Sequence, residues 1–528
     1  MSTKRLVFSF ACILLCFCLS LTSCGIIIFE DDKTEINDTS HAADSEAAEG
    51  SDTESAQSDD SDISIEKKPE SAADRARKRV KELSEIDLKG QSFIIATTSN
   101  MTFATDGDSY YDRVLLLRDS IVEEKYNVDI ITVFSDESMI ETDLRNAALS
   151  GQYYADLLSL PEYKIGRLAK EGLIMNLRSL PFYGTTASYS RFWGEAAAGN
   201  AIYADIGAAS ADFSKIYAVF FNRDISEKMG FDLDKMVDDG EWTWDTFDRL
   251  SRAANEEFGV FGHGSAAMGD ELTDIVFRSS GERLVDNTLG SVPRISFDSQ
   301  KLEELIELTC ALIYGNPAAY KRSATATESD FYKAFGSSRM LFAFAPLSKM
   351  NSFSVLDSNW GILPIPKAEE GQKHYFAYTE ATANVLAVPF NNNKADITGI
   401  MIGALNTASY ELLAEEYKTN CLYNYFGSIK AMRSMDEVLS SMTFDFSFIY
   451  ASGAKSLAVA TYGAVREARK SVSDYATDLI NARSEAANRE LRQLFGEKVI
   501  EDVSSPPLKG DEEQEDVSAS EESTEAAS

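Results

Sequence analysis

Buried strands and amphipathic helices alternate along residues 91–171, and this alternation limits the folds that are open to the chain. The segment QSFIIATT at 91–98 has the composition of a buried strand, and residues 110–126 carry apolar side chains at helical spacing. Strands that alternate with helices of this length form βαβ units around a parallel sheet. The first part of the folded chain is therefore predicted to be α/β. Further elements are expected as strands at 128–134 and 155–160 and as helices at 139–149 and 163–171.

Ligands of such sheets bind beyond the carboxyl ends of the strands, and two loops occupy that place in this sequence. One loop follows the first strand and includes Asn100. The other follows the third strand and holds Ser159, Glu162 and Tyr163. Loops at these positions can also do no more than turn the chain, so a ligand site here requires a second lobe that faces them.

The middle of the chain supplies elements for such a second lobe. Its glycine-rich stretch FGVFGHGSAAMG is interpreted as a loop between helices, because the spacing is not that of a phosphate-binding GxGxxG motif. The expected strands are 216–222, 339–345 and 385–389, and the expected helices are 225–229, 244–256, 272–280, 300–314, 396–410 and 456–495.

The stretch GEWTWDTF holds two of the four tryptophans and could be either an aromatic ligand platform or the start of a helix. With Thr243 as N-cap, its hydroxyl would accept a backbone N–H, and Asp245 would face the positive end of the helix dipole. Trp242 and Phe247 would then occupy the positions of a hydrophobic staple, and Trp244 could lie against the neighbouring lobe. The helix start is the favoured interpretation.

The N-terminus has the layout of a secretory signal, in which two basic residues precede an apolar run that ends in small polar residues and Cys24. The sequence LTSC at 21–24 resembles the bacterial lipobox, in which the cysteine receives a lipid before cleavage makes it the first residue. A plain membrane span over 6–29 is the alternative, because that stretch is about long enough to cross a bilayer. We predict a signal peptide over 1–23 and lipidation of Cys24, which anchors the rest of the chain on the extracellular face of the cell membrane.

Most of the formal net charge of -35 lies in two segments, 25–66 and 501–528, which hold 24 acidic and 2 basic residues. These segments have few aromatic residues and cannot bury enough apolar surface to fold. We therefore predict a disordered acidic tether over 24–80 and a disordered acidic tail over 501–528. No basic stripe offsets this charge, so nucleic acid is not an expected partner.

Motifs for catalysis and cofactor binding are absent from the sequence. HExxH, GxSxG and GxxxxGK[ST] do not occur, and the chain has three histidines. The aspartates of DGDSYYD are spaced like calcium ligands, but Leu117 stands where such a loop needs its glutamate. A pair of carboxylates for glycoside hydrolysis remains open, because separation in space cannot be read from sequence. We predict no cofactor, no metal and no catalytic step.

Several stretches together resemble family 1 of the extracellular solute-binding proteins of ABC importers. In that family a strand ending in Phe-Asn-Lys/Arg is followed by a helix, a glycine, and Gly-x-Trp-Thr-Trp-Asp at the start of the next helix. The matching residues here are Phe221-Asn222-Arg223, Gly230 and 240–245. The resemblance covers roughly residues 88–500, and the lipobox fits the same class. Further matching segments are 155–157 with 171–173, WGILPIPK at 360–367, and 384–389.

The resemblance implies a type 2 periplasmic-binding-protein-like fold, with two α/β lobes joined by hinge crossovers and a ligand cleft between them. The crossovers would fall near 214–219 and 374–384. A permease would receive the solute from the closed protein, which we expect to be a monomer. The implied boundaries are 88–218 plus 384–430 for lobe 1, and 219–374 plus 431–500 for lobe 2.

Many members of the family carry carbohydrates, so a sugar or oligosaccharide is the implied small-molecule ligand. The loop FAPLS at 344–348 lies where sugar-binding relatives commonly present a tryptophan, and here Leu347 or a neighbour stands instead. This departure weakens the expectation of a tryptophan platform. The aromatic candidates for the cleft are Trp193, Phe344 and Tyr378, and the polar candidates are Asn100, Ser159, Glu162, Tyr163 and Glu380.

A secreted surface enzyme that acts on glycans, or an adhesin, is the alternative, because either would share the export signal and the acidic tether. A hydrolase would lose turnover when one carboxylate is removed, whereas a binding protein would show saturable binding and closure. An adhesin would bind a polymer or a host surface without hinge motion.

Overall fold

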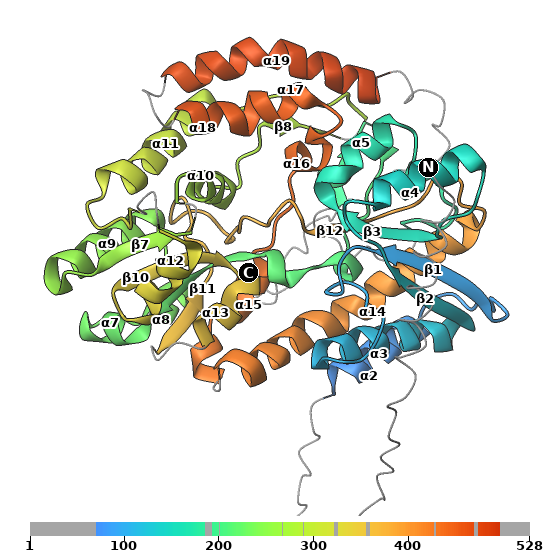
Figure 1. Ribbon diagram of the computed structural model, residues 1–528, viewed down its shortest axis with the longest axis horizontal. Helices are drawn as coiled ribbons and strands as arrows, with labels where there is room; N and C mark the ends of the chain where they lie inside the picture. The colour runs from blue at the N-terminus through green and yellow to red at the C-terminus, as the bar shows by residue number, and fades with distance from the viewer. Residues whose placement is uncertain are drawn as a thin grey trace, which may run out of the picture. The chain divides into compact units, whose positions relative to one another are not determined.

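Two four-stranded sheets organise the protein (Figure 1). All described residues belong to one compact unit of the chain, which begins at Lys68. The predicted signal peptide, Cys24 and the acidic tail lie outside the described part. The computed structural model describes residues 70–184, 193–199, 201–266, 268–288, 290–321, 326–354, 359–426, 429–468 and 474–496.

The first sheet has the parallel core that the alternation of strands and helices predicts. Its strand order is β12-β3-β1-β2, with β1 parallel to both β2 and β3 and with β12 antiparallel to β3. The strands are β1 (Gln91–Thr97), β2 (Val128–Phe134), β3 (Leu157–Pro161) and β12 (Asn384–Ala387). The helices of this part are α3 (Tyr110–Tyr126), α4 (Ile140–Ser150), α5 (Ile165–Lys170), α6 (Trp193–Ala196) and α14 (Ala395–Cys421).

Helix α2 (Ala72–Lys81) shortens the predicted tether, which the sequence analysis extended to residue 80. The side chain of Ser71 caps the helix, and Ala72, Ala76 and Val80 form a buried stripe on one face. This stripe packs against α3 and α14. Its small residues form only a narrow apolar face, so the helix was included in the predicted tether together with the acidic segment before it.

The second sheet combines one parallel pair with antiparallel strands. Its order is β11-β6-β10-β7, in which β10 runs parallel to β7 and β6 runs antiparallel to both β10 and β11. The long strands are β6 (Tyr217–Asn222), β7 (Phe261–Ser265), β10 (Met340–Pro346) and β11 (Trp360–Leu363). The helices of this part are α7 (Arg223–Lys228), α8 (Leu233–Asp238), α9 (Trp244–Phe258), α10 (Met268–Ser279), α11 (Ser299–Cys310), α12 (Glu328–Gly336) and α13 (Met350–Ser354). Two short hairpins pair β4 (Ala197–Ala198) with β5 (Ala201–Ile202) and β8 (Val285–Asp286) with β9 (Arg294–Ile295).

Strand β7 corrects the interpretation of the glycine-rich stretch as a loop between helices. His263 in this strand is fully buried, and its Nδ1 lies 2.7 Å from the hydroxyl of Ser251 on α9. Burial lowers the pKa of His263 to about 4, so the ring is neutral. A Cβ at Gly262 would lie 2.1 Å from the Ser251 hydroxyl. The glycine is required by the close packing of a strand on a helix rather than by a turn.

Helix α9 begins as the sequence predicts. Thr243 is the N-cap, and its hydroxyl accepts a backbone N–H of the first turn at 3.4 Å. The ring of Trp242 packs edge-on against Phe247, with centroids 6.0 Å apart, as a hydrophobic staple requires. Trp244 packs on β10 of its own sheet, so the expected contact with the neighbouring lobe is wrong. Both indoles are buried and belong to the core.

Helix α14 and the segments after it connect the two sheets (Figure 1). The ring of Phe426, just beyond α14, lies 4.6 Å from the ring of Trp360 at the start of β11. Further along the chain, α16 packs against α5, and α19 packs against α11. The C-terminal residues therefore contact helices of both sheets. The remaining helices are α15 (Met435–Ser440), α16 (Phe446–Ala451), α17 (Lys455–Ala458), α18 (Ala464–Ala468) and α19 (Asp474–Phe495).

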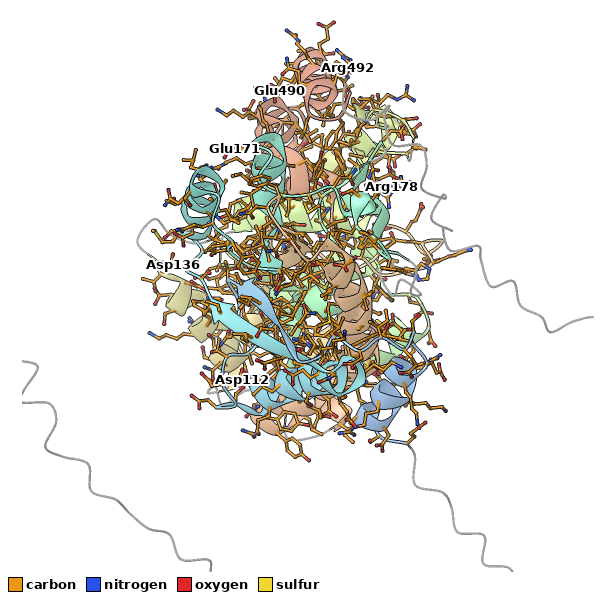
Figure 2. All side chains as sticks on the ribbon, turned by 90° about the vertical axis from the view of Figure 1, so that its right-hand side faces the viewer. Asp112, Asp136, Glu171, Arg178, Glu490 and Arg492 are labelled. Carbon is orange, nitrogen blue, oxygen red and sulfur yellow. The ribbon has the colours of Figure 1, made fainter. Side chains whose placement is uncertain are left out.

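Charged side chains such as those of Asp136 and Glu171 extend outward around the first sheet (Figure 2). Within the described residues, no helix combines the length and the apolar character that crossing a bilayer requires.

The cap of α9 yields a stability test. The Thr243→Ala variant loses the oxygen that accepts the first-turn N–H, and we expect it to reduce the free energy of unfolding by about 1 kcal/mol. Urea denaturation of the variant measures this loss. Thr243→Ser keeps the hydroxyl and should retain most of the stability. Equal losses in both variants would contradict the capping role.

Candidate functional site

Two chain segments cross between the sheets side by side. The N–H of Tyr217 donates to the carbonyl of Tyr378 at 2.9 Å, and the N–H of Glu380 donates to the carbonyl of Lys215 at 3.1 Å. The side chains of Lys215 and Glu380 form an ion pair at 3.3 Å. These segments are the two crossovers expected near 214–219 and 374–384, and they pair like neighbouring antiparallel strands.

A third crossing, which the sequence analysis missed, lies beside the second. It leads from α15 to α16, and the carbonyl of Ser441 accepts the N–H of Ala377 at 2.7 Å. The hydroxyl of Thr443 donates to the carbonyl of Ala377 at 2.5 Å, and its N–H donates to the hydroxyl of Thr379 at 3.2 Å. Three backbone segments therefore join the two halves of the molecule at one place.

Aromatic rings follow one another beside these crossings. The centroids of Tyr217 and Tyr378 lie 5.0 Å apart, and the ring of Tyr378 lies 6.4 Å from that of Phe448 on α16. The ring of Phe448 stacks on that of Tyr462 with centroids 4.5 Å apart. Tyr378 and Phe448 are only partly buried. Part of each side chain therefore remains accessible beside the crossings.

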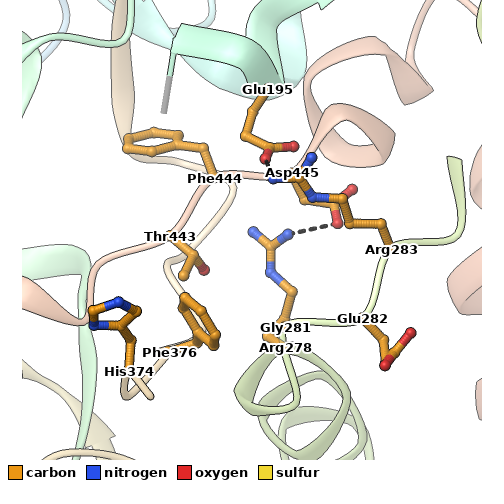
Figure 3. A pocket seen from close by; sticks show the side chains of 10 residues that line it. All are labelled: Glu195, Arg278, Gly281, Glu282, Arg283, His374, Phe376, Thr443, Phe444 and Asp445. Carbon is orange, nitrogen blue, oxygen red and sulfur yellow. Dashed lines mark ion pairs between the residues drawn. The ribbon is translucent and has the colours of Figure 1, made fainter. Parts of the chain in front are cut away.

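Arg278, at the C-terminal end of α10, stands in the middle of a pocket of about 360 Å3 (Figure 3). Its side chain is buried, its Nη1 pairs with Asp445 at 2.8 Å, and its guanidinium lies 5.2 Å from the ring centroid of Phe448. The hydroxyl of Tyr462 also donates to Asp445 at 2.9 Å. Among the described residues, the Nε and Nη2 of Arg278 have no hydrogen-bond partner.

The charge of this arginine acts on Glu162, which belongs to the other sheet because it begins the short 3-10 helix that follows β3. Its side chain is 0% exposed, and neither carboxyl oxygen has a hydrogen-bond partner within the described part of the chain. Burial raises the pKa of Glu162 to about 8, although the positive charge of Arg278 acts in the opposite direction. The carboxyl is therefore protonated at neutral pH.

A second pocket of about 280 Å3 lies where β10 ends, next to the crossings. Phe344 and Glu380 line it, as do Tyr217 and the ion pair of Lys349 with Glu328 at 2.8 Å. The ring of Phe344 is 1% exposed and packs into the core. The carboxyl ends of parallel strands in the second sheet thus open onto a polar pocket.

The first sheet presents a hydrogen-bonded group at its own carboxyl edge. The hydroxyl of Ser159 lies 2.9 Å from that of Thr102 and accepts from the amide of Asn384 at 3.0 Å. Ser99 extends this group by donating to Asp212 at 3.2 Å. Ser159 is fully buried, so its hydroxyl holds the strand ends together.

The structure does not bring the residues proposed from the sequence together at one place. Glu162 and Tyr378 lie near Arg278, and Phe344 and Glu380 line the second pocket. Tyr163 instead donates to Glu137 at 2.5 Å, toward α4. The remaining candidates are the buried Ser159, the exposed Asn100 and Trp193, which begins α6 and whose side chain lies outside the described part.

Arg278, Phe448 and Tyr462 were missed by sequence reasoning. Each stands in an ordinary amphipathic helical segment, and only the third crossing brings the last two residues to the junction. A single arginine among apolar residues, in DIVFRSS, is the one local signal at Arg278. In the described ranges, no group of three or more His, Cys, Asp or Glu side chains is arranged to hold a metal ion.

No protein-family model matches the chain, and no curated protein sequence matches it. Solved structures do match it. The sugar-binding protein MalE from Xanthomonas citri is 11% identical, with a TM-score of 0.53 over 77% of this chain and 100% of that chain. The chain has the fold of the two-lobe, periplasmic-binding-protein-like solute-binding proteins. Each sheet with its helices is the centre of one lobe, and the crossings are the hinge.

Two further solved structures give similar coverage. The galacto-N-biose-/lacto-N-biose I-binding protein of an ABC transporter from Bifidobacterium longum is 13% identical, with a TM-score of 0.49 over 77% of this chain and 98% of that chain. The maltose-binding protein MalE from Listeria monocytogenes is 13% identical, with a TM-score of 0.48 over 77% of this chain and 97% of that chain.

The buried carboxyl of Glu162 makes stability depend on pH in this two-lobe protein. The unfolded chain releases this proton near pH 4.5 and the folded chain only near pH 8, so the protein loses stability as pH rises between these values. We expect Glu162→Gln to remove this loss. The variant should match the wild type at pH 5 and unfold at higher urea concentration at pH 8.

Glu141 provides the opposite control. Although burial opposes it, the hydrogen bond from Lys164 at 3.0 Å and the nearby arginines lower the pKa of Glu141. Glu141→Gln should therefore destabilise the protein at pH 8. A Glu162→Gln variant that is also less stable at pH 8 would show that Glu162 is ionised in the folded protein.

Proposed function

We propose that the protein is a lipid-anchored, extracellular solute-binding component of an ABC importer. It captures a sugar or oligosaccharide between its lobes and delivers it to a permease. The two-lobe fold supports a protein that closes at a hinge, and MalE from Xanthomonas citri, which has this fold, is a sugar-binding protein. The solute class is proposed from the chemistry at the hinge.

One observation carries this proposal: aromatic faces and buried polar groups from both lobes meet beside the three crossings. Tyr378 and Phe448 supply the flat faces that cover the apolar side of a sugar ring. Glu162 from the first lobe and Arg278 from the second supply hydrogen-bonding groups. Arg278 also lines the pocket of about 360 Å3, and a pocket with a few convergent polar groups is the usual form of a small-molecule site.

A ligand that touches both lobes stabilises the closed arrangement, because it binds that arrangement more tightly than the open one. We propose the lobes as 88–218 plus 384–430 and 219–374 plus 431–500. The third crossing brings the residues after 443 into contact with the first lobe as well. The described part of the chain acts as a monomer in this proposal.

A thermal-shift screen tests solute capture. The soluble version should begin at Lys68, because Ser71 caps α2 and the compact unit starts there. A ligand that binds only the folded state raises the melting temperature, by an amount that grows with its concentration. The panel contains glucose, galactose, mannose, xylose and arabinose oligosaccharides, galacturonate and glucosamine oligomers, and peptides.

We expect a neutral sugar to raise the melting temperature and to reduce the radius of gyration in small-angle scattering as the lobes close. A shift with peptides alone would remove the sugar assignment and keep the importer role. Turnover of a glycan, or binding without contraction, would favour the enzyme or the adhesin.

The anchor requires a separate test in the full chain. Cys24→Ala removes the thiol that would receive the lipid, so we expect the protein to leave the membrane fraction or to remain unprocessed. Metabolic labelling with a radioactive fatty acid, followed by membrane fractionation, measures this. Cys24→Ser is the matched control and should behave like the alanine variant. Unchanged labelling and processing would refute the lipobox assignment.

A further inference from the structure

We infer that Glu162 and Arg278 together bind two adjacent hydroxyl groups of a neutral sugar, with one residue contributed by each lobe. The inference rests on the proposed function and names the part of the sugar that the site recognises. Glu162 follows β3 in the first lobe, whereas Arg278 ends α10 in the second. Neighbours common to both residues are Tyr378 and Tyr462.

The atoms of the two residues that lack hydrogen-bond partners are acceptors on Glu162 and donors on Arg278. Among the described residues, both carboxyl oxygens of Glu162 and the Nε and Nη2 of Arg278 are buried and without a hydrogen-bond partner. Buried polar groups are almost always paired, because an orphan donor or acceptor is costly. The Nε and Nη2 of an arginine form a planar pair of parallel donors, and an ionised carboxylate has two acceptors.

A pair of adjacent hydroxyls satisfies all four atoms at once. Each hydroxyl oxygen accepts one N–H from Arg278, and each hydroxyl proton goes to one oxygen of Glu162. A ligand carboxylate could accept from Arg278 but would leave at least one oxygen of Glu162 without a donor. It would also add a buried negative charge beside Asp445, which already neutralises Arg278 at 2.8 Å.

An ammonium group on the ligand fits less well. It would lie against the positive guanidinium, whose charge is held in place by Asp445 and by the ring of Phe448 at 5.2 Å. The charged pairs near this site are otherwise internally balanced: Arg283 pairs with Glu195, and Arg466 pairs with Asp274 at 2.5 Å. A neutral ligand adds no further charge to the one that Glu162 carries when it is ionised.

The same geometry makes binding depend on pH. The hydroxyls donate to the ionised form of Glu162, so binding requires loss of the proton that burial keeps on this carboxyl up to about pH 8. Affinity should therefore rise as pH rises from 6 to 8 and level off above 8. The groups that face Glu162 are Arg278 from α10, Tyr378 from the second crossing and Tyr462 after α17, with Asp274 and Glu195 near these tyrosines.

Calorimetric titration of the neutral sugar that gives the largest shift in the panel tests the inference. Glu162→Gln offers one acceptor in place of two, and Arg278→Lys keeps the charge but loses the parallel donors. We expect each variant to bind about 10- to 150-fold more weakly, the range that hydrogen bonds to charged groups predict. The variant Glu162→Gln should also lose the pH dependence of binding, although at pH 8 it should be more stable than the wild type.

Glu141→Gln is the matched control, because Glu141 is a buried carboxylate of the same lobe that pairs with Lys164 and Arg167, each at 3.0 Å. It should lower stability and leave sugar affinity and its pH profile unchanged. Wild-type affinity in both Glu162→Gln and Arg278→Lys would overturn the inference and leave the proposed function standing. A panel in which only galacturonate or glucosamine oligomers bind would also overturn it, because the ligand would be charged. A panel in which no sugar binds would overturn the inference together with the sugar assignment, and the importer role would also fall if no peptide bound.

Discussion

Backbone pairing between the crossing segments is the constraint on which the rest of the site depends. The segments at 215–217, 377–380 and 441–443 are hydrogen-bonded to one another like strands, so their spacing is fixed by peptide geometry. Three aromatic residues of the junction belong to these segments or follow one of them closely. Tyr217 and Tyr378 belong to the first two segments, and Phe448 lies one helical turn after the third.

This pairing also explains why charged groups are buried where the lobes meet. Asp445 follows the third crossing directly, and there it caps α16 while it accepts from Arg278 and Tyr462. Its hydrogen bonds hold the guanidinium in one orientation and leave the opposite edge of Arg278 directed away from Asp445. Preorganised donors of this kind are costly to bury unless something completes them. The carboxyl of Glu162, which belongs to the other lobe, is likewise costly to bury without a hydrogen-bond partner.

Local patterns predicted the elements well and the junction poorly. Helix α3 and strand β2 have the bounds expected from periodicity. The cap of α9 at Thr243 could be predicted because a cap and a staple depend only on residues that are neighbours in sequence. Strand β7 was missed because its glycines, which permit contact with Ser251, look like loop residues in sequence. Glu162 was proposed because it follows β3, and ligands of parallel sheets bind beyond the carboxyl ends of the strands. Arg278 was missed because its partners Asp445 and Phe448 are more than 160 residues away along the chain, and spacing in sequence carries no information on such convergence.

Contacts outside the crossing segments also join the two lobes, and they affect how much a ligand must contribute to closure. Arg283 pairs with Glu195, and the amide of Asn287 donates to the carbonyl of Ala197 at 3.1 Å. A hinge motion that separates the sheets exposes these groups to water, which replaces each hydrogen bond at a net cost of about 0.5–1.5 kcal/mol. Glu162 and Arg278 differ from these contacts because their orphan atoms gain partners when the lobes open to water. These contacts therefore favour closure, and the unpaired atoms of Glu162 and Arg278 oppose it. In the proposed function, a ligand that completes the junction removes the opposing contribution, so that the closed arrangement of the lobes is favoured.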